Sequence, residues 1–240
     1  MSTDATATAS PVSGEATAWP ALSPTERRVL GVLVEKAKTT PDVYPMSLNG
    51  LITGCNQKHN RDPVLHLESA EVEPALEGLK QKQYAQQITG GGRVDKYRHI
   101  LYEALKVDKV PLAILAELLL RGPQSEGELR GRASRMEPIA DIDTLRGQLR
   151  MLVQRGLVVY LTPENRRGTM LTHGFHPAEE LARIRTRAEQ GNAPAEGETP
   201  AVAREVPGLA DRVSSLEATL ARLQAEVQEI RALVHSSPSA

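Results

Sequence analysis

An internal repeat constrains the fold of this chain more than any other feature of its sequence. Residues 109–174 repeat the pattern of residues 21–104: three segments with helical periodicity, then two short strand-like segments around a turn. The alignment rests on matched apolar and capping positions, which are Val29, Leu30, Leu33 and Ser47 in one copy and Ile114, Leu115, Leu118 and Ser125 in the other. Three helices followed by a hairpin are typical of a winged helix, a variant of the helix-turn-helix. The repeat therefore predicts two tandem winged-helix domains, residues 21–104 and 105–176.

Local signals place the elements of the first copy. Ser23 can cap a helix that has Pro24 in its first turn, and Glu26 completes the spacing of a capping box. Ser47 is the expected cap of a second helix, and a third helix is expected from about Ser69. The segments YAQQIT and RVDKYRHIL flank GGG, and in the second copy LVVYLT and TMLTHG flank PENRRG. Both arrangements predict β-hairpins.

Composition agrees with a mainly helical core. Hydrophobic residues make up 40% of the 240 residues but aromatic residues only 3%, so the core must be aliphatic. We expect a mainly α fold with small β-hairpin wings (α+β). The single cysteine excludes an internal disulfide, the N-terminal residues do not resemble a signal peptide, and no apolar run approaches the roughly 18 residues of a membrane span. These features predict a soluble cytoplasmic protein with no membrane contact.

The flanking segments carry different signals. Residues 1–20 are rich in Ala, Thr, Ser and Pro and are expected to be a disordered tail. A short amphipathic helix is expected at 177–190 and a Pro/Ala/Glu linker at 191–208. Residues 209–235 then show a heptad pattern, which predicts a coiled-coil helix and a homodimer. Its apolar seam is Leu209, Val213, Leu216, Leu220, Leu223, Val227, Ile230 and Val234. A single amphipathic helix docked on the body is the alternative.

The run CNQKHNRDP, residues 55–63, concentrates polar chemistry between the second and third helices. Cys55, His59 and His66 lack the paired spacing of a zinc site, and the chain has no G-x-S-x-G, H-E-x-x-H or Walker motif. We therefore predict neither an enzyme nor a protein with a metal or cofactor. Asn, Asp and Pro favour turns, and an arginine beside a carboxylate can lock one. The run is interpreted as a structural corner, with a partner-binding surface as the alternative: Asn56, Gln57, Lys58, Asn60, Arg61, Asp62 and Pro63.

Several of these segments resemble a known family. ERRVLGVLVEK, TTPDVYPMSLNGLI and CNQKHNRDPV, with LLLRGPQSEGELRGRASRM in the second copy, resemble the YceH family of uncharacterised bacterial proteins. The resemblance covers roughly residues 22–175, together with a C-terminal heptad helix of the kind that family members often carry. It implies a tandem winged-helix fold and implies no reaction. The segment TMLTHGFH departs from the arginine-rich ending that relatives tend to have in the second wing.

Charge placement suggests which copy could contact DNA. A winged helix usually lays its third helix in the major groove, where phosphates favour Lys and Arg. The third helix of the first copy opens with Glu68, Glu71, Glu73 and Glu77, which is unfavourable for that contact. Basic and polar candidates lie mainly in the second copy and on the wings: Arg130, Arg132, Arg135, Arg146, Arg150, Gln154, Arg166, Arg167, Arg93, Lys96 and Arg98.

Two hypotheses follow for the function. The first is a dimeric DNA-binding or regulatory protein that contacts double-stranded DNA through its second winged helix. The alternative is an adaptor whose winged helices and coiled coil bind a protein partner. The acidic third helix and the near-neutral charge favour the adaptor, since residues 103–177 carry eleven Lys and Arg against nine Asp and Glu. Fold analogy favours DNA binding slightly.

Overall fold

The computed structural model describes residues 19–191, except 90–93, 165 and 167. The expectations for residues 1–18, for the linker from residue 192 and for the heptad segment therefore lie outside the described residues, as do Arg93 and Arg167. Both copies of the repeat belong to one compact unit. The chain is mixed α/β, mainly helical, with two small antiparallel sheets of three strands each in the described part.

The first copy forms α1 (Pro24–Thr39), a 3-10 turn (Pro41–Val43), β1 (Met46–Ser47), α2 (Leu48–Cys55), α3 (Ser69–Gln81), β2 (Ala85–Ile88) and β3 (Lys96–His99). The predicted start of α1 is confirmed, because the Ser23 hydroxyl accepts from the Glu26 amide at 3.2 Å and the Glu26 carboxylate accepts from the Ser23 amide at 2.8 Å. Ser47 caps α2 as expected. Helix α3 begins at Ser69, and Pro74 lies inside it.

The second copy repeats this order after the short helix α4 (Leu101–Leu105). It consists of α5 (Lys109–Arg121), β4 (Gln124–Ser125), α6 (Glu126–Ala133), α7 (Ile142–Gln154), β5 (Val158–Tyr160) and β6 (Met170–His173), and α8 (Ala178–Glu189) follows. Strand order is β1-β3-β2 in one sheet and β4-β6-β5 in the other. Both predicted hairpins are confirmed, and the identical strand order extends the repeat from sequence to topology.

The strands β1 and β4 are absent from the sequence expectations. Each has two residues directly before a helix, so no alternation of apolar and polar residues reveals it. Met46 pairs with Tyr97, and Gln124 pairs with Leu171, on the second strand of each hairpin. These pairings fix the start of α2 and of α6 against the neighbouring hairpin.

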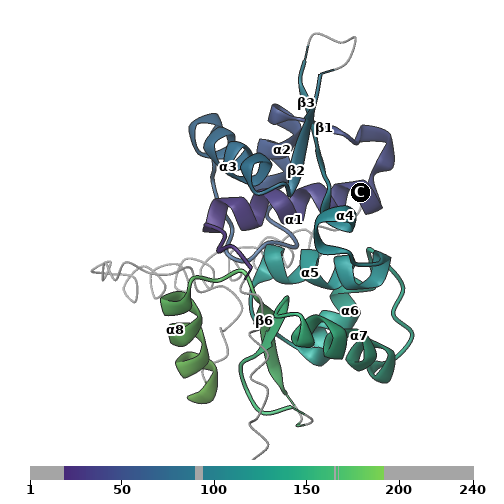
Figure 1. The fold of residues 1–240 in the computed structure, drawn as a ribbon, viewed down its shortest axis with the longest axis vertical. Coiled ribbons are helices and arrows are strands. Elements are labelled where there is room, and N and C mark those ends of the chain that lie inside the picture. The colour runs from purple at the N-terminus through teal and green to yellow at the C-terminus, as the bar shows by residue number, and fades with distance from the viewer. Residues whose placement is uncertain (1–18, 90–93, 165, 167, 192–240) are drawn as a thin grey trace, which may run out of the picture. The chain divides into compact units, whose positions relative to one another are not determined.

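The two copies pack against each other through α1 and α5, which lie side by side in Figure 1. The contact is close because it includes Gly31, where an added Cβ would lie 2.8 Å from Leu120 Cγ. Aliphatic side chains fill the core, as the composition predicts, and Leu30, Leu33, Leu115 and Leu118 are fully buried. Phe175 adds an aromatic contact to this core, because its ring centroid lies 6.1 Å from that of Tyr84.

Ordered contacts begin before the first predicted domain. Residues 19 and 20 were expected in the disordered tail, but the Trp19 indole donates a hydrogen bond to the Arg155 carbonyl at 2.7 Å. Its ring centroid lies 6.4 Å from that of Phe175. Trp19 therefore ties the start of the described chain to the second copy. None of the helices that the structure describes combines the length and the apolar character needed to cross a membrane.

Candidate functional site

Arg61 is the centre of the polar corner between α2 and α3. Its guanidinium is buried and forms a two-pronged ion pair with Glu35 of α1, with Nη1–Oε1 at 3.1 Å and Nη2–Oε2 at 2.6 Å. It also donates to the carbonyls of Gly54 and Asn60 and to the side-chain oxygen of Gln57. Burial raises the pKa of Glu35, but the hydrogen bonds and charge of Arg61 outweigh it and leave that pKa below its usual value. The carboxylate that locks the corner is thus Glu35, from another helix, and not Asp62.

Asparagines complete the corner through backbone contacts. The Asn56 amide donates to the Leu67 carbonyl at 2.8 Å and accepts from the Leu67 amide at 2.7 Å. Asn60 has a positive φ of 61°, and its side chain accepts from Arg121 of α5. The Asp62 amide donates to the Leu120 carbonyl at 3.1 Å. The run therefore closes its own turn and also joins the first copy to the second.

The remaining residues of the run divide by exposure. Cys55 is fully buried, and burial raises its pKa to about 11, which keeps it a thiol. Lys58 and His59 are exposed, and Gln57 is half-buried. The Pro63 carbonyl accepts from Arg28 at 2.5 Å. No group of three or more residues that could hold a metal ion occurs within the described ranges.

The third helix of the first copy presents an acidic face. Glu71, Glu73 and Glu77 are exposed along α3. Glu71 accepts from the Glu68 amide at the helix start, which is one structural use for an acid there. Lys80 pairs with Glu77 at 2.8 Å and Lys82 with the buried Glu26 at 2.6 Å. The basic end of α3 is therefore occupied by ion pairs with carboxylates.

The predicted basic residues of the first wing are exposed but few. Lys96 and Arg98 lie on β3, and the Arg98 guanidinium donates twice to the side chain of Gln86 on β2. Arg93 lies outside the described residues.

Three of the predicted arginines of the second copy hold that copy together. Arg130 donates to the carbonyls of Ile139 and Ala140, and Arg132 donates to Gln124 and pairs with Glu128. Arg135 lies 3.3 Å from Glu117, a carboxylate of α5 with no exposed surface. Burial raises the pKa of Glu117, and the charges of Arg135 and Arg121 oppose that shift. These contacts were not predicted, although an acid in the apolar run LAELLL could have signalled Glu117.

On α7 the predicted contact residues separate into two kinds. Arg146 pairs with the buried Glu126 at 2.9 Å, and Glu126 also accepts from the Tyr160 hydroxyl at 3.0 Å. Arg150 and Gln154 are exposed, and the structure gives their side chains no partner among the described residues. Arg166, in the turn of the second wing, is also exposed, and Arg167 lies outside the described residues. The structure thus leaves Arg150, Gln154 and Arg166 available to a partner in this copy.

Comparison with known proteins identifies the family. The family model described as "Protein of unknown function, DUF480" matches residues 22–167. The chain belongs to the DUF480 family. That assignment is consistent with the resemblance to the YceH family that the motifs of the sequence indicate.

Similar bacterial proteins cover most of the chain. A UPF0502 protein of Rhodopirellula baltica is 50% identical over 181 residues, which is 74% of this chain and 76% of the relative. A UPF0502 protein of Geobacter sulfurreducens is 49% identical over 179 residues, 73% of this chain and 80% of the relative. One of Citrifermentans bemidjiense is 46% identical over 180 residues, 74% and 84% of the two chains. The names of these relatives state no activity.

Proposed function

We propose that this protein is a non-enzymatic, regulatory DNA-binding protein whose two repeats are winged-helix domains. Each repeat has three main helices followed by an antiparallel hairpin, and a short strand before its second helix completes the sheet. This is the element order of a winged helix, in which the third helix enters the major groove and the hairpin contacts the backbone. By that analogy α3 and α7 are the two candidate recognition helices.

The observation that carries the proposal is the charge of α7. From Thr144 to Gln154 the helix has two arginines and no acid, whereas α3 has three exposed glutamates. Leu145, Leu149 and Leu152 face the core, so the opposite side of α7, with Arg150 and Gln154, is free to meet a groove. Arginine suits both phosphate and guanine edges, and glutamine suits adenine. We therefore assign the DNA contact to the second copy.

The contact surface proposed here is small. Arg150, Gln154 and Arg166 form it, while Arg146 stays with Glu126 because removing it would leave a buried carboxylate without its cation. Asp143, at the start of α7, opposes an approaching phosphate. A single surface of this size gives weak, salt-sensitive binding. We propose that the heptads of residues 209–235 join two chains, so that two weak contacts act together on one duplex.

Fluorescence anisotropy with a labelled 30-base-pair random duplex between 50 and 300 mM KCl tests the proposal. Each lost phosphate contact makes the negative slope of log K against log salt shallower by about 0.9. The variant Arg150→Gln/Arg166→Gln should therefore bind more weakly, with a slope shallower by about 2. Arg183→Gln/Arg185→Gln on α8 removes the same charge elsewhere and should leave both values unchanged. If both variants lose the same DNA affinity, the effect comes from net charge alone and not from a contact through α7 and the second wing.

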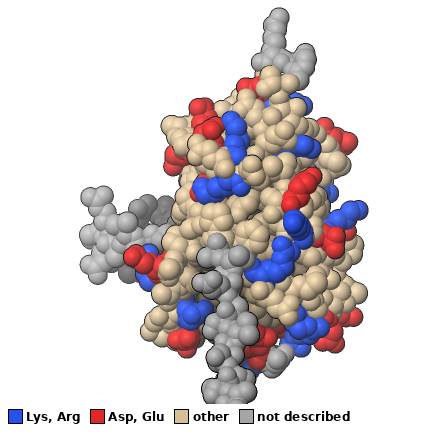
Figure 2. All heavy atoms as spheres, in the orientation of Figure 1, with Lys and Arg blue, Asp and Glu red and all other residues tan. Residues whose placement is uncertain are grey.

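A second candidate function is a protein adaptor, favoured by the surface charge. On the face seen in Figure 2, Lys and Arg are interspersed with Asp and Glu and do not form one basic patch. The exposed glutamates of α3 suit a basic partner surface better than a phosphate backbone. Crosslinking mass spectrometry in the native host distinguishes the two functions. An adaptor loses a specific crosslinked partner in Glu73→Lys/Glu77→Lys and keeps it in Arg150→Gln/Arg166→Gln.

A further inference from the structure

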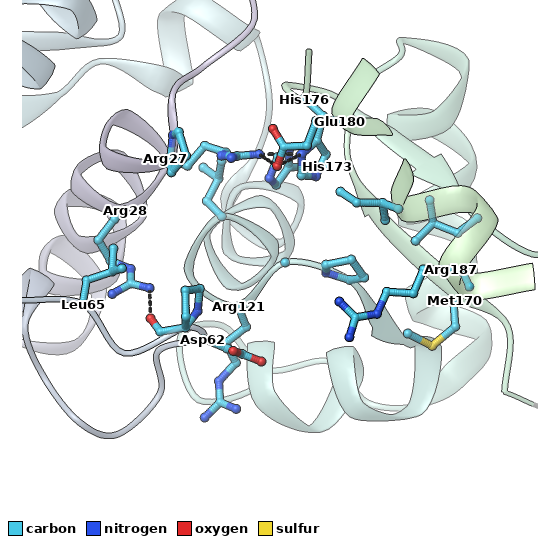
Figure 3. A pocket seen from close by; sticks show the side chains of 18 residues that line it. Arg27, Arg28, Asp62, Leu65, Arg121, Met170, His173, His176, Glu180 and Arg187 are labelled. Atoms are coloured by element: carbon cyan, nitrogen blue, oxygen red, sulfur yellow. Dashed lines mark hydrogen bonds and ion pairs between the residues drawn. The ribbon is translucent and has the colours of Figure 1, made fainter. Parts of the chain in front are cut away.

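A cavity of about 250 Å³ lies where the two copies meet α8. Its wall is formed by the first turn of α1, the polar corner, the end of α5, β6 and α8, and Figure 3 shows the side chains that point around it. Ligand pockets typically have about 300–1,000 Å³, so this one suits a small molecule. None of the DNA-contact residues proposed above lines it.

Basic groups outnumber acidic ones in the cavity wall. Four arginines line it, Arg27, Arg28, Arg121 and Arg187, against two carboxylates, Asp62 and Glu180. Burial, with a further contribution from Arg27, lowers the pKa of His176 to about 4, so this histidine adds no charge at neutral pH. Arg27 is paired with Glu180 at 2.9 Å, and Arg121 is paired with Glu117 of α5 at 3.3 Å, so the positive excess that favours an anion is centred on Arg28.

Arg28 contributes most to that excess because no carboxylate forms an ion pair with it in the described chain. The residue is 3% exposed, and its guanidinium donates to the carbonyls of Cys55 and Pro63. Its Nε is buried and makes no hydrogen bond to any described group. A buried cation held by neutral dipoles alone is costly, and a nearby anion would offset that cost.

At another edge of the cavity, a polar cluster attaches α8 to the body (Figure 3). Arg27 donates to Glu180 at 2.9 Å and also contacts His176 Nδ1. His176 Nε2 lies 2.9 Å from the Thr172 hydroxyl, and its ring stacks on that of His173 with centroids 3.9 Å apart. The cluster fixes one edge of the cavity. Helix α8, which forms part of the wall, has no buried residue.

The rest of the wall is apolar. Leu65, Leu119, Leu161, Met170 and Ile184 line it together with three prolines. A ligand that fills this space must therefore combine an apolar body with a compact anionic group. A carboxylate matches the two-pronged geometry of arginine, and its single charge is less repelled by Asp62 and Glu180 than a phosphate dianion would be.

We propose that this cavity is a binding site for a small carboxylic acid with an apolar aliphatic or aromatic body. Its carboxylate faces the arginines, and its body lies against the leucines and Met170. The ligand would contact both copies and α8 at once, so its binding would stabilise their mutual packing. The inference does not depend on the proposed DNA contact, because its test measures ligand binding alone.

Isothermal titration of the full-length protein with benzoate and hexanoate tests the site, with benzamide, hexanamide and inorganic phosphate as comparison probes. We expect at least one carboxylate to bind saturably, with a Kd on the order of 0.1–1 mM for so few atoms. Its amide should bind at least tenfold more weakly. Absence of saturable binding by both acids, equal binding of acid and amide, or stronger binding of phosphate would overturn the proposal.

Two pairs of variants on α8 locate the binding. Ala188→Trp fills the cavity and should abolish binding, whereas Ala182→Trp adds the same ring at an exposed position and should preserve it. Arg187→Gln should weaken the carboxylate at least threefold and leave the amide unchanged, and Arg185→Gln should change neither. If Ala188→Trp does not fold, the comparison of Arg187→Gln with Arg185→Gln still tests whether the ligand binds in this cavity. Unchanged carboxylate binding in Arg187→Gln and in a folded Ala188→Trp would place the ligand elsewhere and overturn the proposal.

Discussion

At the scale of single residues, the buried pair of Arg61 and Glu35 is the most consequential contact of the corner. Arg61→Ala would leave the buried Glu35 without its two-pronged partner and with only Lys36 at 3.6 Å, which costs about 3–5 kcal/mol of unfolding free energy. Replacing both residues, as Arg61→Met/Glu35→Leu, should recover a large part of that loss, because the buried carboxylate is removed together with the buried guanidinium. Urea unfolding measures both values. Lys58→Ala, at an exposed position of the same run, is the control and should change stability by less than about 0.5 kcal/mol.

Buried histidines determine a second property at this scale, the response of stability to acid. Burial lowers the pKa of His99 to about 4, from 6.5. Between pH 4 and pH 6.5 the unfolded chain binds more protons than the folded chain. The contribution of the neutral His99 to the free energy of unfolding is therefore fully present above pH 6.5 and is lost as the pH falls towards 4. At pH 5 the loss is about 2 kcal/mol.

His176, whose pKa is also about 4, adds a loss of the same sign. The measurement is urea unfolding at pH 7 and at pH 5. His99→Gln should reduce the difference between the two pH values, whereas His59→Gln, at an exposed position, should preserve it. A stability that is equal at both pH values in the unmodified protein would contradict a neutral, buried His99.

At the scale of elements, the packing of α1 on α5 depends on Gly31. An alanine Cβ there would lie 2.8 Å from Leu120 Cγ and 3.3 Å from Leu119 Cβ, and Leu120 is fully buried. Gly31→Ala should therefore cost about 1–3 kcal/mol through overpacking, despite the better helix propensity of alanine. Gly131→Ala on α6 meets nothing within 4 Å and should gain about 0.5–1 kcal/mol. Thermal and urea unfolding of the two variants give the comparison, and a gain in both would show that the interface accommodates the methyl group.

Elements were predictable where their signals are local. Helix caps and glycine-containing turns depend on residues that lie close together in the sequence. Ser23, Ser47 and Ser125 therefore marked the starts of α1, α2 and α6 correctly. The partners of Arg61, Arg135 and Arg146 were not predictable, because Glu35, Glu117 and Glu126 lie 18 to 26 residues away in sequence. Packing in three dimensions thus gives a structural role to several arginines that the sequence suggests as DNA contacts. It also brings residues between 24 and 188 together around one cavity.

At the scale of the whole molecule, the proposed mode of action requires two chains. A three-residue contact of Arg150, Gln154 and Arg166 is too small to hold a duplex alone at physiological salt, because each phosphate contact weakens steeply with ionic strength. Linking two such contacts raises the effective concentration of the second once the first has formed. The heptads of residues 209–235 supply that link in the proposal, with Leu216 and Leu220 at adjacent seam positions.

Light scattering after size-exclusion chromatography tests the link. The unmodified protein should have twice the mass of one chain, and Leu216→Glu/Leu220→Glu should have the mass of one chain, because carboxylates in an apolar seam are costly to bury. Ser214→Glu, outside the seam, should remain dimeric. The monomeric variant should keep its unfolding transition and lose DNA affinity by at least tenfold, since it retains α7 and lacks the second contact. A monomeric unmodified protein would contradict the dimer, and a monomeric variant with full DNA affinity would show that one chain suffices.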